Sequence, residues 1–491
     1  MIDLTIHPAP RRAAIRRARE RGIVLPTFEE MKHPEKISPK IKERLRHVGL
    51  WDLDSANLFR ISWKNAPQPS GGLHGGVNYF EIPSALSGVR ARIVGLVGKW
   101  FPTGAHKVGA SYACLVPRLV TGQFDPTAQK AVWPSTGNYC RGGAYNAALL
   151  GCESVAILPA GMSPERFEWL SKVAGEVIAT PGSESNVKEI FDKTWELRRT
   201  RDDVVIFNQF DEMGNHLWHY EVTGGALEEV FQALRGDRGR VAGTFFTSGS
   251  AGTLAAGNAM KDRHPRSKFA VGEALQCPTL LKNGFGAHRI EGIGDKHVPW
   301  IHDVRETDLI VALDDEDCMA LVRLFNDPAG RAYLKGRGVA EEVVDRLDLL
   351  GISGVANLLG AIKMAKYYEL SEDDFVFTVF TDSMELYGSR LEEMAEVRGP
   401  YDAVQAAVDC HAHLWGIKDD GLIELTYPER QRVHNLKYYT WVEQQGRTLE
   451  ELQAQWYDYD AYWGKLRRQA GAIDRLIEDF NRESGALEQL V

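Results

Sequence analysis

Short apolar runs alternate with amphipathic stretches through the middle of the chain. The apolar runs are rich in Val, Ile and Phe and predict strands at residues 130–135, 154–160, 176–182, 203–208, 241–249, 268–275, 308–315 and 375–383. Stretches with helical spacing separate them, at residues 141–151, 163–175, 185–200, 251–264 and 354–370. This alternation is typical of βαβ units whose parallel strands are covered on both faces. The two series predict an α/β fold of two doubly wound lobes with a ligand cleft between them.

The two ends of the chain follow a different pattern. Residues 1–77 carry charged helical stretches, and residues 399–491 are helix-like and rich in Trp and Tyr. We predict an N-terminal extension over 1–77, a catalytic region over 78–398 and a helical C-terminal extension over 399–491. Within the catalytic region, a smaller mobile lobe of about residues 110–225 is inserted in the larger one. The aromatic residues of the C-terminal extension predict packing against the core or a second subunit, and we expect a homodimer or higher homo-oligomer.

Charge and composition narrow the class of function. The chain has 491 residues and a net charge of −9, which argues against nucleic acid or an anionic membrane as the main partner. No apolar run approaches the ~18 residues of a membrane span, and the first residues are charged. The six cysteines are scattered without a CxxC pair, so neither a disulfide framework nor a metal site is expected. These features predict a reduced, cytoplasmic protein.

One lysine lies in an unusual setting. In "GKWFPTGAHKVGAS", Lys107 follows a Pro-Thr-Gly turn and is followed at once by small and apolar residues. Such surroundings lower the pKa of a lysine by desolvation, and an unprotonated amine is the form that attacks an aldehyde.

Turns of small residues follow several of the predicted strands. "WPSTGN" contains Ser135 to Asn138, and "FFTSGSAGT" contains Ser248 to Thr253. A third small-residue segment, "GISGVA", surrounds Ser353. A Gly- and Ser-rich turn that opens a helix exposes backbone N–H groups and binds anions, so the 248–253 turn is the candidate phosphate site. An ordinary βα turn has a similar composition. Neither a P-loop nor a GxGxxG fingerprint is present.

Together these segments resemble the fold-type II pyridoxal-phosphate enzymes, and cysteine synthase and cystathionine β-synthase most closely. The resemblance covers about residues 78–392 and keeps the family's order of motifs. The segments are "NYFEIPSAL", "FPTGAHKVGA", "STGN", "TSGSAGTLAAG", "AHRIEGIGDKHVPW", "GISGVANLLGAIKMAK" and "VFTVFTDSMELY".

The resemblance implies pyridoxal 5′-phosphate as cofactor and a role for each matching residue. Lys107 would hold the cofactor as a Schiff base and remove the substrate's Cα proton. His106 is interpreted either as a phosphate contact or as a structural histidine. The phosphate would lie in the turn of Ser248, Gly249, Ser250, Ala251, Gly252 and Thr253. Asn138 would bind the cofactor's 3′-oxygen and Ser353 would face the pyridine nitrogen. The substrate would contact the loop of Ser135, Thr136, Gly137 and Asn138. Tyr139 and Arg141 depart from the family's pattern, and we assign them to the substrate site as well.

Ser353 bears on the chemistry that the resemblance implies. A neutral hydroxyl leaves the pyridine nitrogen largely unprotonated, so the ring is a weaker electron sink. Loss of a β-substituent is then favoured, and the resulting aminoacrylate either takes a nucleophile or hydrolyses. We therefore expect β-replacement on a small amino acid with a β-leaving group. A β-eliminating lyase of the cysteine desulfhydrase or serine/threonine dehydratase type is the alternative, and a catalytically silent regulatory subunit is the alternative of another class.

Two departures from the family pattern affect the choice of substrate. "TGAHK" is the spelling of the tryptophan synthase β subunit, but "STGNYCRGG" lacks that family's loop glutamate, so tryptophan synthesis is not expected. Arg141 adds a cation after the loop. It is interpreted either as a contact for an acidic substrate group or as a helix-surface arginine.

Overall fold

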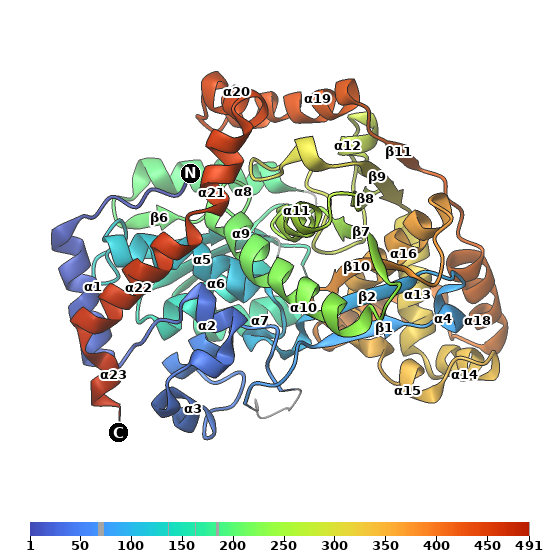
Figure 1. The fold of residues 1–491 in the computed structure, drawn as a ribbon, viewed down its shortest axis with the longest axis horizontal. Helices are drawn as coiled ribbons and strands as arrows, with labels where there is room; N and C mark the ends of the chain where they lie inside the picture. Colours follow the sequence, from blue (N-terminus) through green and yellow to red (C-terminus); the bar gives the residue numbers. More distant parts are fainter. Residues whose placement is uncertain (67–72, 136, 163, 183–185, 491) are drawn as a thin grey trace.

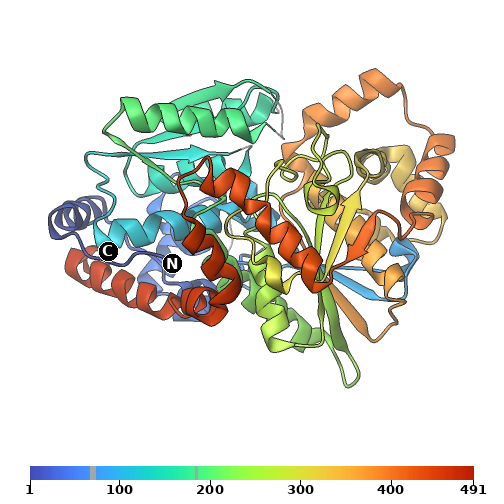
Figure 2. The same ribbon diagram turned by 90° about the horizontal axis from the view of Figure 1, so that it is seen from above.

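Two β-sheets lie side by side at the centre of the molecule (Figures 1 and 2). The computed structural model describes residues 1–66, 73–135, 137–162, 164–182 and 186–490. In these residues the larger sheet has the order β1-β2-β10-β7-β8-β9-β11, and its five inner strands are parallel. The edge strands β1 and β11 are antiparallel to their neighbours. Its strands are β1 (Tyr79–Ile82), β2 (Arg92–Val97), β7 (Arg240–Thr247), β8 (Lys268–Ala274), β9 (Leu309–Leu313), β10 (Asp374–Phe380) and β11 (Leu422–Glu424).

The smaller sheet is wholly parallel, with the order β5-β4-β3-β6 in the described residues. Every residue of β4 is buried, as expected of a parallel strand covered on both faces. The strands are β3 (Lys130–Pro134), β4 (Ser154–Pro159), β5 (Glu176–Thr180) and β6 (Val204–Ile206), connected by α6 (Asn138–Leu149), α7 (Pro164–Val173) and α8 (Val187–Thr200). The two predicted α/β lobes are confirmed. The lobe boundaries that we predicted stay a prediction.

Helices cover the larger sheet on both faces (Figure 1). The hydrophobic residues of α16, among them Val355, Leu359 and Ile362, pack into one core cluster with Phe245 of β7. The main helices of this lobe are α9 (Met213–Trp218), α10 (Gly224–Leu234), α11 (Leu254–Arg263), α13 (Asp315–Asn326), α14 (Pro328–Gly336), α16 (Ile352–Tyr367) and α17 (Gly388–Arg398).

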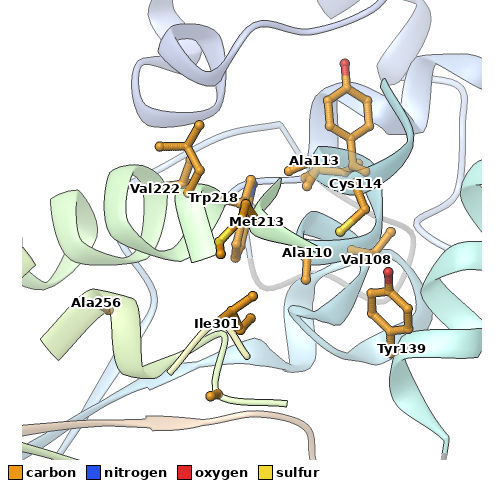
Figure 3. Packing of buried hydrophobic residues seen from close by; sticks show 14 of the residues in the cluster. Val108, Ala110, Ala113, Cys114, Tyr139, Met213, Trp218, Val222, Ala256 and Ile301 are labelled. Atoms are coloured by element: carbon orange, nitrogen blue, oxygen red, sulfur yellow. The ribbon is translucent and has the colours of Figure 1, made fainter. Parts of the chain in front are cut away.

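Helix α5 (Lys107–Thr121) forms the central packing surface between the lobes. Figure 3 shows Val108, Ala110 and Cys114 of this helix near Met213 and Trp218 of α9. All five side chains are buried in one hydrophobic cluster. The first residue of α5 is Lys107, so the cluster fixes the backbone from which the candidate amine projects.

The N-terminal and C-terminal extensions pack on each other and on α5. Helix α1 (Pro8–Arg21) lies beside α22 (Ala470–Ser484), as Figure 1 shows. The backbone of Leu25 exchanges two hydrogen bonds with the Asn481 amide, of 2.9 and 2.8 Å. Asp474 accepts hydrogen bonds from the backbone N–H groups of Phe28 and Glu29, which open α2 (Phe28–Lys32).

The C-terminal extension is not entirely helical. Its segment Leu422–Glu424 forms β11, which pairs with β9 through Leu422 and Val311. The prediction of a helical extension is therefore right for most of its length but missed this edge strand. Three residues are too few to give an alternating pattern that sequence inspection detects. Its helices include α18 (Ala403–Asp409), α19 (Tyr427–Asn435), α20 (Leu449–Tyr457), α22 and α23 (Ala486–Gln489).

Among the described residues, no helix combines the length and the apolar character that crossing a bilayer requires.

Candidate active site

A pocket between the two lobes brings the predicted residues together. Its volume is about 640 Å³ when the space at its open mouth is included. Its walls come from the start of α5, the start of α6, the turn before α11 and the start of α16. The predicted residues that line it are His106, Lys107, Ser135, Gly137, Asn138, Tyr139, Gly249, Ser250, Ala251, Thr253 and Ser353.

Lys107 points at the candidate phosphate turn. Its Nζ donates a hydrogen bond of 2.8 Å to Oγ of Ser250 and lies 3.4 Å from Oε1 of Gln209. Ser250 Oγ also accepts a hydrogen bond of 3.1 Å from the Asn215 amide. The amine and the small-residue turn, separated by 143 positions in the sequence, are thus in direct contact.

The turn from Ser248 to Thr253 has the geometry of an anion site. Ala251 adopts a left-handed conformation with φ 65°, so the turn curls before α11 begins at Leu254. Such turns direct successive N–H groups into one concavity, and the helix dipole adds positive potential there. Gly249 is required for packing as well, because a Cβ atom there would lie 2.3 Å from the carbonyl oxygen of Gly292.

Two members of the predicted turn do not line the pocket. Ser248 accepts a backbone hydrogen bond of 3.1 Å from Gly294, and its own N–H donates to Gly272. A Cβ atom on Gly252 would lie 2.0 Å from Oδ1 of Asn215, which indicates that this glycine lets the turn approach α9. Ser248 and Gly252 therefore affect the shape of the turn without lining the pocket. Thr136, predicted to contact substrate, lies outside the described residues.

His106 is fully buried beside Lys107. Its ring centroid lies 5.5 Å from that of Trp63 and 4.9 Å from that of His219. Burial, together with the charge of the neighbouring Lys107, lowers the pKa of His106 to about 3, so the imidazole is neutral. Both ring nitrogens are buried without a hydrogen-bond partner in the described part of the chain.

Asn138 and Asp382 join the lobes at the pocket. The Asn138 amide donates a hydrogen bond of 2.6 Å to Oδ2 of Asp382, which also accepts 2.7 Å from the Tyr387 hydroxyl. Oδ1 of Asn138 is buried and has no partner among the described residues. An orphaned amide oxygen in a pocket wall indicates a missing polar partner.

Arg166 extends this network and was not singled out from the sequence. It lines the pocket, with Nη2 donating 3.1 Å to the Tyr387 hydroxyl and Nη1 lying 3.0 Å from Oε2 of Glu291. Glu291 also binds Arg390 over 2.6 Å. Because α7 belongs to the smaller lobe, while Tyr387 and Glu291 belong to the larger, the two contacts of Arg166 are further bridges across the cleft.

Asp295 is the second residue that sequence reasoning missed. It lines the pocket and is 7% exposed. Burial raises the pKa of its carboxyl to about 7, against a lowering by Lys107. The available signal was its position in "GIGDKH", within a segment already recognised, but a single acidic residue there does not reveal where it points.

Arg141 does not line this pocket. Its side chain lies one turn further along α6, in an adjoining pocket with Trp51 and Trp169. At 4% exposure it is also not the helix-surface arginine of the second interpretation.

The pocket fits pyridoxal phosphate on its own geometry. A lysine amine, a curled turn of N–H donors, the orphaned Asn138 oxygen and the buried Ser353 hydroxyl all face one space. These groups match an aldehyde, a phosphate and a polar aromatic ring.

Comparison with known proteins gives the same assignment. The model of the family described as "Pyridoxal-phosphate dependent enzyme" matches residues 101–382. A probable cysteine synthase of Bacillus subtilis is 29% identical over 288 residues, covering 58% of this chain and 85% of that protein. Cystathionine β-synthase of Saccharomyces cerevisiae is 24% identical over 319 residues, covering 62% of this chain and 59% of that protein.

A solved structure supports the fold. Cysteine synthase of Entamoeba histolytica superposes with a TM-score of 0.56 at 18% identity, covering 69% of this chain and 93% of that one. With the family model matching more than half of its length, this chain belongs to the pyridoxal-phosphate dependent enzymes.

Proposed function

We propose that this enzyme catalyses β-replacement on a small α-amino acid that carries a leaving group on its β-carbon. The observation that carries the proposal is the contact between Lys107 Nζ and Ser250 Oγ in a pocket that the Ser353 hydroxyl also lines. The cofactor, when bound, supplies an electron sink that makes the substrate's Cα proton acidic and lets the β-substituent leave. The similarity to a probable cysteine synthase and to cystathionine β-synthase favours this reaction type.

The residues of the pocket are assigned separate roles in binding and proton transfer. We assign the phosphate to the turn containing Gly249, Ser250, Ala251 and Thr253, and the substrate carboxylate to the loop at Ser135, Gly137 and Asn138. Ser353 would face the ring nitrogen as a neutral partner. Lys107, attached to the rigid start of α5, would hold the cofactor and then move the Cα proton.

Asp295 is assigned as a second proton-transfer group. A carboxyl with a pKa near 7 is partly protonated at neutral pH, so it both accepts and donates protons there. It lines the same pocket as Lys107, and the charge of Lys107 stabilises its ionised form. In β-replacement it would deprotonate the incoming nucleophile or protonate the departing group.

The first test concerns the cofactor. Protein purified with pyridoxal phosphate should show the visible absorbance of a lysine-bound aldehyde. Borohydride reduction followed by peptide mass spectrometry should locate the label on Lys107. A colourless protein, or a label on another lysine, would contradict the assignment.

The second test separates replacement from elimination. The holoenzyme is incubated with O-acetylserine, with and without a thiol, and the products are identified by mass spectrometry. Replacement predicts a thioether amino acid whose formation requires the thiol. Pyruvate and ammonia at a rate that is independent of the thiol would instead identify an eliminating lyase. Gel filtration of the same sample tests the expected homo-oligomer.

A further inference from the structure

A second pocket adjoins the candidate active site. Its volume is about 720 Å³ when the space at its open mouth is included. Arg166 lines both pockets. Its walls come from three parts of the chain. Trp51 belongs to the N-terminal extension, Trp169 to α7 of the smaller lobe and Glu385 to the larger lobe.

Arg141 is a buried cation in the wall of this pocket with no anionic partner. It is 4% exposed, and within the described part of the chain its guanidinium makes no hydrogen bond or ion pair. Arg166, in contrast, is paired with Glu291. Burying an uncompensated charge is unfavourable, so an arginine held this way indicates a missing anion.

Two tryptophans hold Arg141 in place. Its guanidinium carbon lies 5.5 Å from the ring centroid of Trp51 and 5.0 Å from that of Trp169. The two indole rings are 6.4 Å apart at 71° to each other. Such contacts offset part of the desolvation of a cation but provide no hydrogen-bond acceptor for its N–H groups.

The pocket is connected to the reaction centre through two elements. Asn138 and Arg141 are three residues apart on α6, so their Cβ atoms are roughly 5–6 Å apart on one helix face. Trp51 packs against the turn before Lys107, where a Cβ atom on Gly104 would lie 3.1 Å from its ring. A ligand group at Arg141 therefore belongs to a molecule that reaches toward the active site.

The acidic residues of this pocket are already occupied or exposed. Glu165 accepts hydrogen bonds from the backbone N–H and the hydroxyl of Ser389, at 3.0 and 2.9 Å. Glu385 is exposed and lies 3.9 Å from Lys99. Among the described residues, neither carboxylate forms an ion pair with Arg141.

We propose that Arg141, Trp51 and Trp169 form a subsite for an oxyanion, a carboxylate or phosphate, on the reactant that enters or leaves at the β-carbon. This rests on the proposed β-replacement and names the class of its reactant. The N-terminal extension then contributes to specificity by supplying Trp51.

Two matched pairs of reactants test the subsite in kinetics. With O-acetylserine as amino acid, 3-mercaptopropionate is compared with its neutral analogue 3-mercaptopropionamide. With 2-mercaptoethanol as thiol, O-phosphoserine is compared with O-acetylserine. A preference for 3-mercaptopropionate over its amide places the oxyanion on the incoming group. A preference for O-phosphoserine over O-acetylserine places a phosphate on the leaving group. In either arm Arg141→Met should reduce the preference roughly 10- to 100-fold, and Arg141→Lys should reduce it less. No preference in either arm, or a preference that survives Arg141→Met, would overturn the proposal.

Stability and ligand binding give readouts that do not depend on turnover. Arg141→Met should raise the melting temperature, because it removes an uncompensated buried charge. The matched control is Arg323→Met. Arg323 is also buried over an aromatic ring, that of Tyr401, but it donates a hydrogen bond to Gly399. Because that bond is lost, Arg323→Met should lower the melting temperature. A lower melting temperature in Arg141→Met would assign Arg141 a merely structural role.

A titration distinguishes failure of the subsite from failure of the reaction. Tryptophan fluorescence of the holoenzyme is followed while inorganic phosphate, 3-mercaptopropionate or 3-mercaptopropionamide is added. A saturable change with one of the two anions, absent with the amide and lost in Arg141→Met, supports the subsite even if no thiol gives product. A response that is the same in Arg141→Met, or no response to either anion, overturns it.

Discussion

The amide of Asn138 donates a hydrogen bond of 2.6 Å to the Asp382 carboxylate, joining the first residue of α6 to the segment just after β10. The bond connects the smaller lobe to the larger one at the wall of the active site. Asp382 is fully buried, and burial raises the pKa of its carboxyl, while hydrogen bonds from Tyr387 and Asn138 lower it. Buried polar contacts thus join the two lobes in addition to the hydrophobic packing of α5.

Asp382→Ala should destabilise the protein. It leaves the Asn138 amide and the Tyr387 hydroxyl without their acceptor, and the free energy of unfolding should fall by about 2–4 kcal/mol. Urea denaturation measures the change. Glu393→Ala is the control, because it removes an exposed partner of Arg390 and should have little effect. Equal stability of the two variants would contradict the bridging role.

Lys107→Ala should abolish covalent attachment of the cofactor and reduce the turnover rate by roughly 10²–10⁴-fold. The physical reason is the loss of both the attaching amine and the base beside the substrate's Cα. Absorbance and steady-state kinetics measure the two effects. Because α5 is held by its buried residues, circular dichroism of the variant should match the wild type. A variant that keeps both colour and activity would exclude Lys107.

Asp295→Asn should remove a limb of the pH–rate profile. The wild-type carboxyl has a pKa of about 7, so its ionisation changes across the neutral range. The amide cannot ionise, and the turnover rate should fall by roughly 10²-fold with a flattened profile near pH 7. Steady-state kinetics from about pH 5.5 to about pH 9 measure the pH dependence of the turnover rate. An unchanged profile would contradict the assignment of Asp295 to proton transfer.

The same residue predicts how stability depends on pH. The folded-state pKa of Asp295 lies above its ordinary value of 3.8, so between these values the folded protein binds a proton that the unfolded chain releases. Stability of the cofactor-free protein should therefore fall as pH rises from about 4 to about 7, by up to about 4 kcal/mol from this group. The contribution should be absent in Asp295→Asn. A difference between the two proteins that is constant with pH would contradict the raised pKa.

Asp474→Ala tests the connection between the two extensions. Asp474 accepts hydrogen bonds of 2.7 and 3.2 Å from the first N–H groups of α2, so its loss should cost about 1–2 kcal/mol. Asp479→Ala, which removes an exposed pair with Arg482 on the same helix, should cost less than about 0.5 kcal/mol. Thermal unfolding of both variants provides the comparison, and equal costs would indicate that the α2 contact adds nothing.

Local patterns were sufficient to predict the lobes and the central residues of the pocket. The apolar runs predicted β3 to β10, because buried parallel strands are continuous apolar runs. They did not predict β2 or β11 of the larger sheet. Lys107, Asn138, Ser250 and Ser353 each lie in a short motif at the start of a helix or in a turn, where spacing along the chain determines spacing in space.

Contacts between distant segments could not be predicted in the same way. Arg166 and Glu291 belong to different lobes, and their pairing depends on how the lobes dock. Arg141 was singled out as a substrate contact, but it lies about one helical turn beyond Asn138 on α6, which places it in the adjoining pocket. Trp51 lies in an extension outside the motifs that carried the resemblance, so its place beside α6 had no signal in the sequence.

The pairing of α1 with α22 affects how the protein loses structure. Arg19 donates hydrogen bonds to the backbone carbonyls of Ser484 and Glu483, and both helices contact α5, which begins at Lys107. Fraying of either helix strips the apolar cover from the other and from the outer side of α5. Proteolytic trimming at one end of the chain should consequently loosen the opposite end, so that Lys107 loses its rigid support before either sheet comes apart.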